Sequence, residues 1–157
     1  AYQQYGILPD VVSFAKGIGG GLPLGGILAN EKCRNVLGPG MHATTFGGNP
    51  VSCAGGCAVL EQLSDDVLEE VKIKGELSRD YIEGMHSPYV AGVRGLGLMI
   101  GVQLTGISHK ELAQRCIDRG LLVLTAKTVL RLLPPLNITY EEIDQGLEIL
   151  EKSILEG

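Results

Sequence analysis

The sequence has few aromatic residues and no excess of positive charge. Its 157 residues include no tryptophan, and the aromatic share is only 4%. The formal net charge is −5, so the basic face that nucleic-acid binding requires is lacking. No uninterrupted apolar run reaches the roughly 18 residues of a membrane-spanning helix. Since 45% of the residues are hydrophobic, we expect a globular α/β protein that binds neither nucleic acid nor membrane.

The cysteines do not form a metal-binding pattern. There are four, Cys33, Cys53, Cys57 and Cys116, and the central pair is four residues apart rather than at the CxxC spacing of zinc sites. Small residues surround Cys53 and Cys57, which predicts buried thiols. No basic-then-apolar leader opens the sequence. We therefore expect no metal and a reduced, cytoplasmic protein.

A single lysine, Lys16, follows an apolar run and precedes a glycine-rich segment. The run Val11 to Ala15 predicts a buried strand of the parallel-sheet type. In open α/β sheets, reactive groups lie beyond the carboxyl ends of such strands. Apolar surroundings would lower the pKa of the Lys16 amine and make it a nucleophile for a Schiff base. The alternative is a solvated surface lysine beside an ordinary glycine turn.

A second segment, residues 42–50, combines hydroxyl groups, glycines and a helix start. Asn49 suits the N-cap position and Pro50 the first position of a helix. Thr44 and Thr45 lie just before this start, where free N–H groups and hydroxyl donors together suit a phosphate. The alternative is an ordinary capped turn.

Four runs of the sequence together resemble one family. They are AKGIGGGLPLGG around Lys16, HATTFGGNP ending at Pro50, VRGLGLMIGVQL from Val93 to Leu104, and LRLLPPLNIT from Leu130 to Thr139. These runs resemble the class III, or ornithine-type, pyridoxal-phosphate aminotransferases of fold type I. The resemblance extends over essentially the whole chain, with the runs in the order the family has them.

The resemblance implies a C-terminal portion of the family's fold. We expect the end of the large-domain sheet in residues 1–63 and a small C-terminal α/β domain in residues 64–157, where the charge rises. The predicted strands are 11–15, 24–28, 90–94, 99–104, 121–125 and 129–133, and the predicted helices are 31–37, 50–63, 64–85, 108–119 and 139–157. In the first long helix of the second part, Val67, Leu68, Val71, Leu77 and Ile82 are predicted to form the apolar stripe.

The resemblance also implies roles for particular residues. The residue matching Lys16 binds pyridoxal 5′-phosphate covalently and then moves a proton at the substrate. The hydroxyl matching Thr45, with the backbone of Thr44, reaches the cofactor phosphate of a neighbouring subunit, which implies a homodimer or larger assembly. Arg131 matches an arginine that binds a substrate carboxylate, as a planar bidentate guanidinium suits; by itself it would be read as an edge-strand arginine in a surface ion pair. Arg94 is interpreted as structural.

The implied reaction is amino transfer from N-acetylornithine to 2-oxoglutarate in arginine biosynthesis. An ornithine- or 4-aminobutyrate-type aminotransferase is the alternative within the family, and a non-catalytic domain that only self-associates is the alternative outside it. The family's aspartate for the pyridine nitrogen, its phosphate cup and its stacking aromatic all lie upstream of Lys16 and are not in this sequence. We therefore expect a partial enzyme that is inactive alone.

Overall fold

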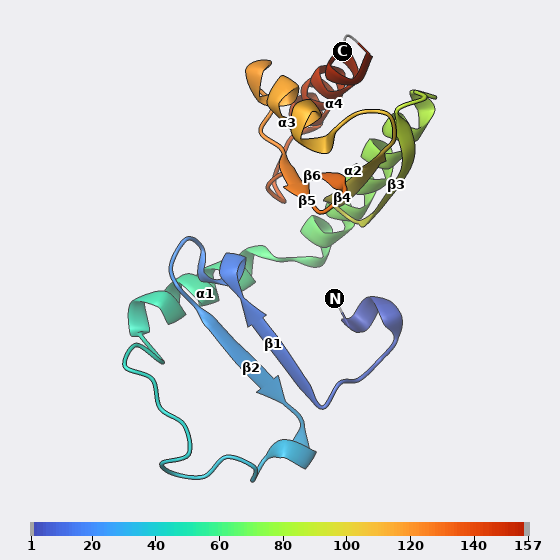
Figure 1. The fold of residues 1–157 in the computed structure, drawn as a ribbon. Helices are drawn as coiled ribbons and strands as arrows, with labels where there is room; N and C mark the ends of the chain where they lie inside the picture. Colours follow the sequence, from blue (N-terminus) through green and yellow to red (C-terminus); the bar gives the residue numbers. More distant parts are fainter. Residues whose placement is uncertain (1, 156–157) are drawn as a thin grey trace. The chain divides into compact units, whose positions relative to one another are not determined.

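The chain folds as two compact units that divide between Ser64 and Asp65 (Figure 1). This computed structural model describes residues 2–155, and each unit is described by itself. Within those residues, no helix combines the length and apolar character needed to cross a membrane.

Over residues 2–64, the first unit consists of a two-stranded hairpin, one long helix and three short 3-10 helices. Its elements are η1 (Tyr2–Tyr5), β1 (Val11–Ala15), η2 (Lys16–Gly19), β2 (Gly25–Ala29), η3 (Glu31–Cys33) and α1 (Pro50–Gln62). The helix predicted over residues 31–37 is only the short η3. A long irregular segment joins η3 to α1 (Figure 1).

Strand β1 has the predicted bounds but neither the predicted pairing nor the predicted burial. It runs antiparallel to β2, with Val11 opposite Ala29 and Ala15 opposite Gly25. Exposed residues alternate with half-buried ones along β1. The prediction of a buried, parallel strand was therefore wrong for the described residues. The short connection after Lys16 reverses the chain, so that β2 runs antiparallel beside β1.

Helix α1 packs against η2 through glycines. A Cβ added to Gly55 would lie 2.9 Å from the Gly19 carbonyl oxygen, and one added to Gly56 would lie 2.6 Å from Leu24 Cδ2. Cys53 and Cys57 lie off this face and are exposed, so the prediction that both are buried was wrong. Glycine rather than cysteine forms the contact because only glycine permits this close approach.

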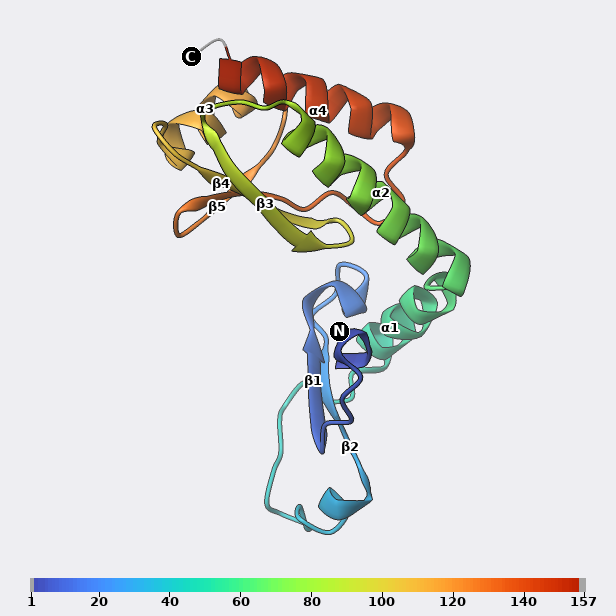
Figure 2. The same cartoon turned by 90° about the vertical axis from the view of Figure 1, so that its right-hand side faces the viewer.

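The second unit is an antiparallel sheet covered by helices. Its elements are α2 (Asp65–Gly84), β3 (Val90–Leu96), β4 (Met99–Leu104), α3 (His109–Asp118), β5 (Leu124–Ala126), β6 (Val129–Leu132) and α4 (Tyr140–Leu155). The strand order is β3-β4-β6-β5, and every neighbouring pair is antiparallel. Figure 2 shows α2 and α4 together on one face of the sheet.

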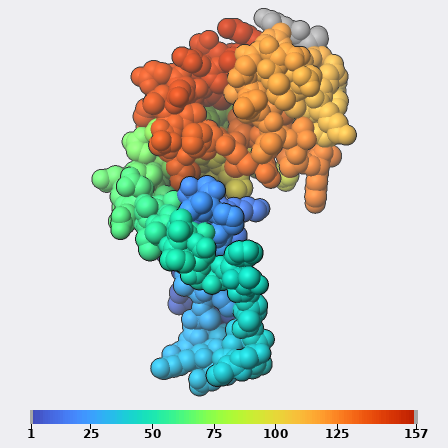
Figure 3. All heavy atoms as spheres, turned by 90° about the vertical axis from the view of Figure 1, so that its left-hand side faces the viewer, coloured from blue at the N-terminus to red at the C-terminus, as the bar shows by residue number. Residues whose placement is uncertain are grey.

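The core of the second unit lies between the sheet and its helices. Residues from every helix and from the central strands are fully buried there, among them Ile82, Leu112, Val102, Leu130 and Ile154. In Figure 3, the orange and red C-terminal part of the chain forms most of the surface of this unit on the face shown.

The buried face of α2 differs from the predicted stripe. Ile82 is buried as expected, but Leu68 and Leu77 are 45% and 50% exposed. Gly75 is buried instead and lies against Gly97 in the β3–β4 turn. A helix that approaches a turn this closely has room for small side chains on its contact face, and hence its leucines point elsewhere.

The ends of the helices follow local signals. The Thr139 N–H donates to Glu142 Oε2 at 2.9 Å, and the Glu142 N–H donates to Thr139 Oγ1 at 3.2 Å. The spacing of Thr139 and Glu142 in the sequence predicts a capping box before α4, and these bonds confirm it. Ser108, which the sequence predicts as the N-cap of α3, precedes this helix but makes no side-chain capping bond. Gly120, just after α3, has the left-handed φ of +92° that a helix end favours.

Candidate active site

Lys16 directly follows β1 and begins η2. Its φ is +62°, a left-handed conformation that costs a residue with a side chain about 1–2 kcal/mol. The side chain is exposed, and it forms no hydrogen bond or ion pair with the described residues. The amine is therefore free to react with a ligand.

The surroundings of Lys16 are open rather than apolar. Among the described residues of the first unit, only Gly19, Ser52 and Gly56 are buried, so these residues do not form the apolar enclosure expected around the lysine. A Cβ added to Gly17 or Gly21 would have no neighbour within 4 Å. The backbone beside the amine thus leaves space for a bulky planar group.

The threonine turn lies just ahead of α1. The Gly47 N–H donates to the Thr44 carbonyl at 3.3 Å, and Asn49 caps α1 by accepting from the N–H groups of Val51 and Ser52 at 3.0 and 3.1 Å. The predicted N-cap is therefore confirmed. Thr44 and Thr45 are exposed, and their hydroxyls make no hydrogen bond to the described residues. Both hydroxyls remain available to a ligand.

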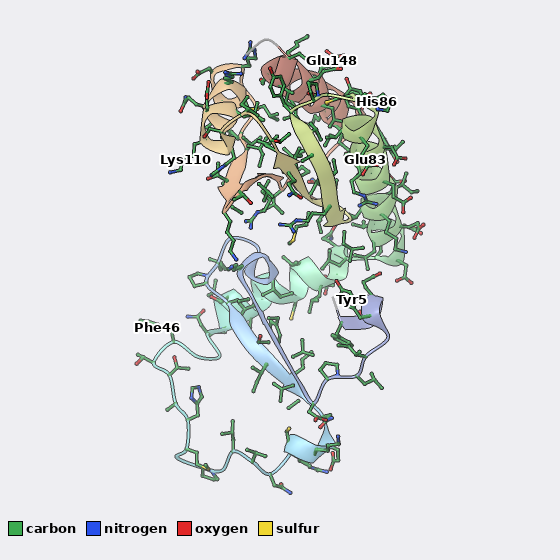
Figure 4. The ribbon with its side chains drawn as sticks, turned by 45° about the vertical axis from the view of Figure 1, so that its right-hand side comes forward. Tyr5, Phe46, Glu83, His86, Lys110 and Glu148 are labelled. Carbon is green, nitrogen blue, oxygen red and sulfur yellow. The ribbon has the colours of Figure 1, made fainter. Side chains whose placement is uncertain are left out.

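Phe46 shows how open this turn is. It follows the two threonines, projects from the loop (Figure 4) and is 81% exposed.

No hydrogen bond among the described residues joins Lys16 to Thr44 or Thr45. The amine and the hydroxyls therefore lie in one unit without forming a joint cluster through direct bonds.

Arg131 lies in the second unit, on strand β6. It is directly opposite Gly101 of β4 and Leu124 of β5. Its Nε is buried and lacks a hydrogen-bond partner. The surface ion pair considered for Arg131 is not found among the described residues, which leaves its guanidinium available to an anion.

The sequence interpretation missed the position of Arg94. It is also directly opposite Gly101, on the other side of β4 from Arg131. Each arginine lies on a strand with apolar neighbours, but only the strand register places them in one row. Because register is a non-local property, no local signal could have paired them.

No metal centre is present in the part of the chain that the structure describes. No group of three or more His, Cys, Asp or Glu side chains is arranged to hold a metal ion there. His42, in the exposed segment before the threonines, has no hydrogen bond or ion pair within that part. The reactive groups of the candidate site are therefore an amine, hydroxyls and a guanidinium.

Comparison with known proteins identifies the family. A sequence model described as "Aminotransferase class-III" matches residues 1–154. The chain is 44% identical to the acetylornithine aminotransferase of Haemophilus ducreyi, over 99% of this chain and 39% of that protein. The chain belongs to the class III aminotransferase family.

Solved structures show the same fold. The acetylornithine aminotransferase of Elizabethkingia anophelis matches with a TM-score of 0.90 at 32% identity, over 99% of this chain and 43% of that one. The ornithine aminotransferase of Toxoplasma gondii, described with partial occupancy of PLP at its active site, matches with a TM-score of 0.92 at 28% identity, over 99% and 38%. The chain thus spans about 40% of the length of its relatives.

Proposed function

We propose that this chain is part of a pyridoxal-phosphate-dependent aminotransferase that moves the amino group of N-acetylornithine to 2-oxoglutarate in arginine biosynthesis. The family match and the names of its relatives support this proposal. The observation that carries it is the free Lys16 amine at the end of β1, beside backbone with room for a planar ring.

Lys16 is the residue we assign to covalent attachment and proton transfer. The residues present fit pyridoxal phosphate. Its aldehyde requires a free amine as nucleophile, which Lys16 offers, and its phosphate requires hydrogen-bond donors, which the unpaired threonine hydroxyls offer. When bound, this cofactor supplies the electron sink of the reaction. Once displaced by substrate, the neutral Lys16 amine would accept the proton from the substrate Cα and return it two atoms away, across the imine nitrogen, in a 1,3 shift.

Thr44 and Thr45 are assigned to the phosphate. The Thr45 hydroxyl and the Thr44 backbone would donate hydrogen bonds, and the nearby start of α1 favours negative charge. In the family that the sequence resembles, the matching threonine reaches the cofactor phosphate of a neighbouring subunit. We therefore propose a homodimer or larger assembly in which each copy lends its threonines to the other.

Arg131 is assigned to a substrate carboxylate. A carboxylate oxygen would accept the bond that its buried Nε lacks, and a second oxygen would accept from a terminal nitrogen of the guanidinium. This geometry would hold the substrate in one orientation. Residues 1–63 and 64–157 would belong to the large and small domains of a cytoplasmic enzyme, and the chain by itself would be a partial, inactive enzyme.

An ornithine-type aminotransferase is the second candidate. The TM-score of 0.92 to the Toxoplasma gondii ornithine aminotransferase favours it. Half-reactions with N-acetylornithine and with ornithine, in the full-length protein that contains this chain, would separate the two candidates. Faster consumption of ornithine would overturn the acetylornithine assignment.

Covalent trapping tests the role of Lys16. The chain would be titrated with pyridoxal phosphate, reduced with borohydride and mapped by peptide mass spectrometry. We expect saturable labelling at Lys16, loss of this label in Lys16→Ala, and retention of it in Lys32→Ala. Lys32 is the matched control because it is an exposed lysine of the same unit, held 3.0 Å from Asp10. Equal labelling of many lysines, with no preference for Lys16, would contradict the proposal.

A further inference from the structure

Two exposed cysteines lie about one turn apart on α1. Cys53 and Cys57 are both free and exposed, and they are four positions apart in a helix that runs from Pro50 to Gln62 (Figure 1). Residues four apart in an α-helix are related by about 6 Å of rise and a rotation of about 40°. Both thiols therefore project from the same face of the helix.

The cysteine face is turned away from the contact between α1 and η2. The buried residues of α1 are Ser52 and Gly56, and Gly55 and Gly56 form its close approach to η2 and Leu24. Each cysteine directly follows one of the two buried residues, so it lies about 100° further round the helix. Neither thiol forms a hydrogen bond with the described residues. A reagent can therefore reach both sulfurs from the same side.

The spacing of the two thiols is too long for a disulfide and suits a bridge of one atom. Side chains four apart on a helix have Cβ atoms about 5–6 Å apart, whereas a disulfide needs about 3.5–4.5 Å. A central atom bonded to both sulfurs, at about the 2.3 Å of a Zn–S bond, lets them stand up to about 4.6 Å apart. Rotation about the two Cα–Cβ bonds brings the sulfurs within this span while the helix backbone stays in place.

The pair offers two sulfurs without a third protein ligand. In the part of the chain that the structure describes, no group of three or more His, Cys, Asp or Glu side chains is arranged to hold a metal ion. The three or four protein ligands of a zinc site are therefore lacking there. A trivalent arsenic atom that already carries one carbon substituent has two positions left. Such an atom is a soft centre, and thiolates are soft ligands, so two thiols on one helix face match its needs.

We propose that Cys53 and Cys57 form a chelating dithiol site for monosubstituted trivalent arsenicals. In the reaction, R–As(OH)2 and the two thiols give R–As bonded to both sulfurs, together with two molecules of water. Two As–S bonds replace two As–O bonds, the thiol protons leave on the departing oxygens, and no atom changes its oxidation state. The inference goes beyond the proposed function and is independent of it, because the site uses neither Lys16 nor the threonines.

Phenylarsine oxide is the probe. It would be added to the reduced chain, and binding would be followed by intact-mass spectrometry and by calorimetry. We expect one tight adduct, with the mass of an added C6H5As group less two hydrogens, on the peptide that contains both cysteines. An excess of 2,3-dimercaptopropanol should remove the arsenical, whereas 2-mercaptoethanol at the same thiol concentration should not, because two linked sulfurs compete better than two separate ones.

Removal of either thiol should abolish the chelate. Cys53→Ser and Cys57→Ser should each weaken binding by about 100-fold or more, since the second bond then loses the high effective concentration of a neighbouring thiol. Cys33→Ser is the matched control and should leave binding unchanged. Cys33 belongs to η3, which follows the end of β2, whereas α1 packs against η2 at the opposite end of the hairpin.

A third variant separates the geometry of the pair from the number of thiols. Cys57→Ser combined with Ala58→Cys keeps two thiols at exposed positions of α1 but turns them about 140° apart around the helix. It should bind the arsenical as weakly as Cys53→Ser does, with the helical circular dichroism of the unaltered chain. The inference is overturned if the unaltered chain forms no adduct, if it binds no more tightly than the serine variants, or if the displaced pair binds as well as the native one.

Discussion

The Tyr81 hydroxyl donates a hydrogen bond of 2.8 Å to Glu151 Oε2, which joins α2 to α4. A second bond of the same kind runs in the opposite direction, from the Tyr140 hydroxyl of α4 to Glu70 Oε2 of α2 at 2.9 Å. Lys74 adds to this second contact, with its Nζ 3.4 Å from Glu70 and 5.0 Å from the centre of the Tyr140 ring. Side-chain hydrogen bonds thus connect α2 and α4 at two separate places.

The stability of the second unit should fall in strongly alkaline solution because of Tyr81. Its hydrogen bond to Glu151, with smaller contributions from burial and from the negative charge, raises its pKa to about 12 from an ordinary 10.0. A pKa raised by folding contributes stability below pH 10 that is lost between pH 10 and 12. Urea unfolding of Tyr81→Phe should show a smaller loss over this interval than the unaltered chain.

Tyr89→Phe is the control for this experiment. Tyr89 lies in the same unit and is 39% exposed, close to the 38% of Tyr81, but its hydroxyl makes no hydrogen bond with the described residues. Tyr89→Phe should lose as much stability between pH 10 and 12 as the unaltered chain does. Because Tyr81 is partly exposed, we expect its replacement to cost less than about 1 kcal/mol at neutral pH. If Tyr81→Phe and Tyr89→Phe lost the same amount of stability between pH 10 and 12, the Tyr81–Glu151 bond would be excluded as the cause.

Replacing Gly75 by alanine should destabilise the second unit. The new Cβ would lie 2.7 Å from Gly97 Cα and closer still to the Gly97 carbonyl, and this neighbour is backbone that cannot rotate away. We expect a cost of about 1–3 kcal/mol, as for other overpacked sites. The free energy of unfolding from urea titration measures it.

Gly84→Ala on the same helix provides the comparison. A Cβ there would have no neighbour within 4 Å, so the higher helix propensity of alanine should leave stability unchanged or raise it by up to about 1 kcal/mol. If both alanine variants behaved alike, the close contact of Gly75 with Gly97 would not contribute to stability.

Much of the fold could be predicted from local sequence signals. Thr139 with Glu142 and Asn49 with Pro50 marked helix starts that the structure confirms, because capping depends on residues close in sequence. The pairing direction of β1 was predicted wrongly, since it depends on which strand lies beside it. The buried face of α2 was also missed, because a contact between Gly75 and a distant turn decides it.

For the candidate site, the sequence shows which residues stand out but not their backbone conformation or strand register. Lys16 stands out in the sequence because an apolar run ends there and glycines begin, but nothing local indicates its left-handed backbone. Arg131 is visible as a charge on an apolar strand. Its relation to Arg94 is set by the register of three strands, which hydrophobic alternation alone does not specify across the whole sheet.

The cysteines should differ sharply in reactivity. Cys53 and Cys57 are exposed, whereas Cys116 is fully buried and burial raises the pKa of its thiol. Since the thiolate is the reactive form, iodoacetamide should modify Cys53 and Cys57 in the native chain and Cys116 only in denaturant. Mass spectrometry of the modified peptides measures this order. Fast modification of native Cys116 would show that the core of the second unit opens readily.

The turn between β5 and β6 stores backbone strain at Lys127. Ala126 and Val129 pair across a two-residue turn, and Lys127 takes a φ of +54° there. A left-handed residue with a side chain costs about 1–2 kcal/mol, while glycine loses about 0.5–1 kcal/mol through its freer unfolded state. Lys127→Gly should therefore raise the free energy of unfolding by about 0.5–1 kcal/mol.

Lys127→Ala separates strain from charge in this turn. Alanine removes the positive charge but keeps the Cβ that the left-handed conformation disfavours, so we expect no gain in stability from it. If alanine stabilised the chain as much as glycine, charge repulsion rather than backbone geometry would be the cause. If Lys127→Gly did not raise the free energy of unfolding, the left-handed conformation of Lys127 would carry no net cost in this hairpin. Relief of strain at this turn could then not be used to stabilise the second unit.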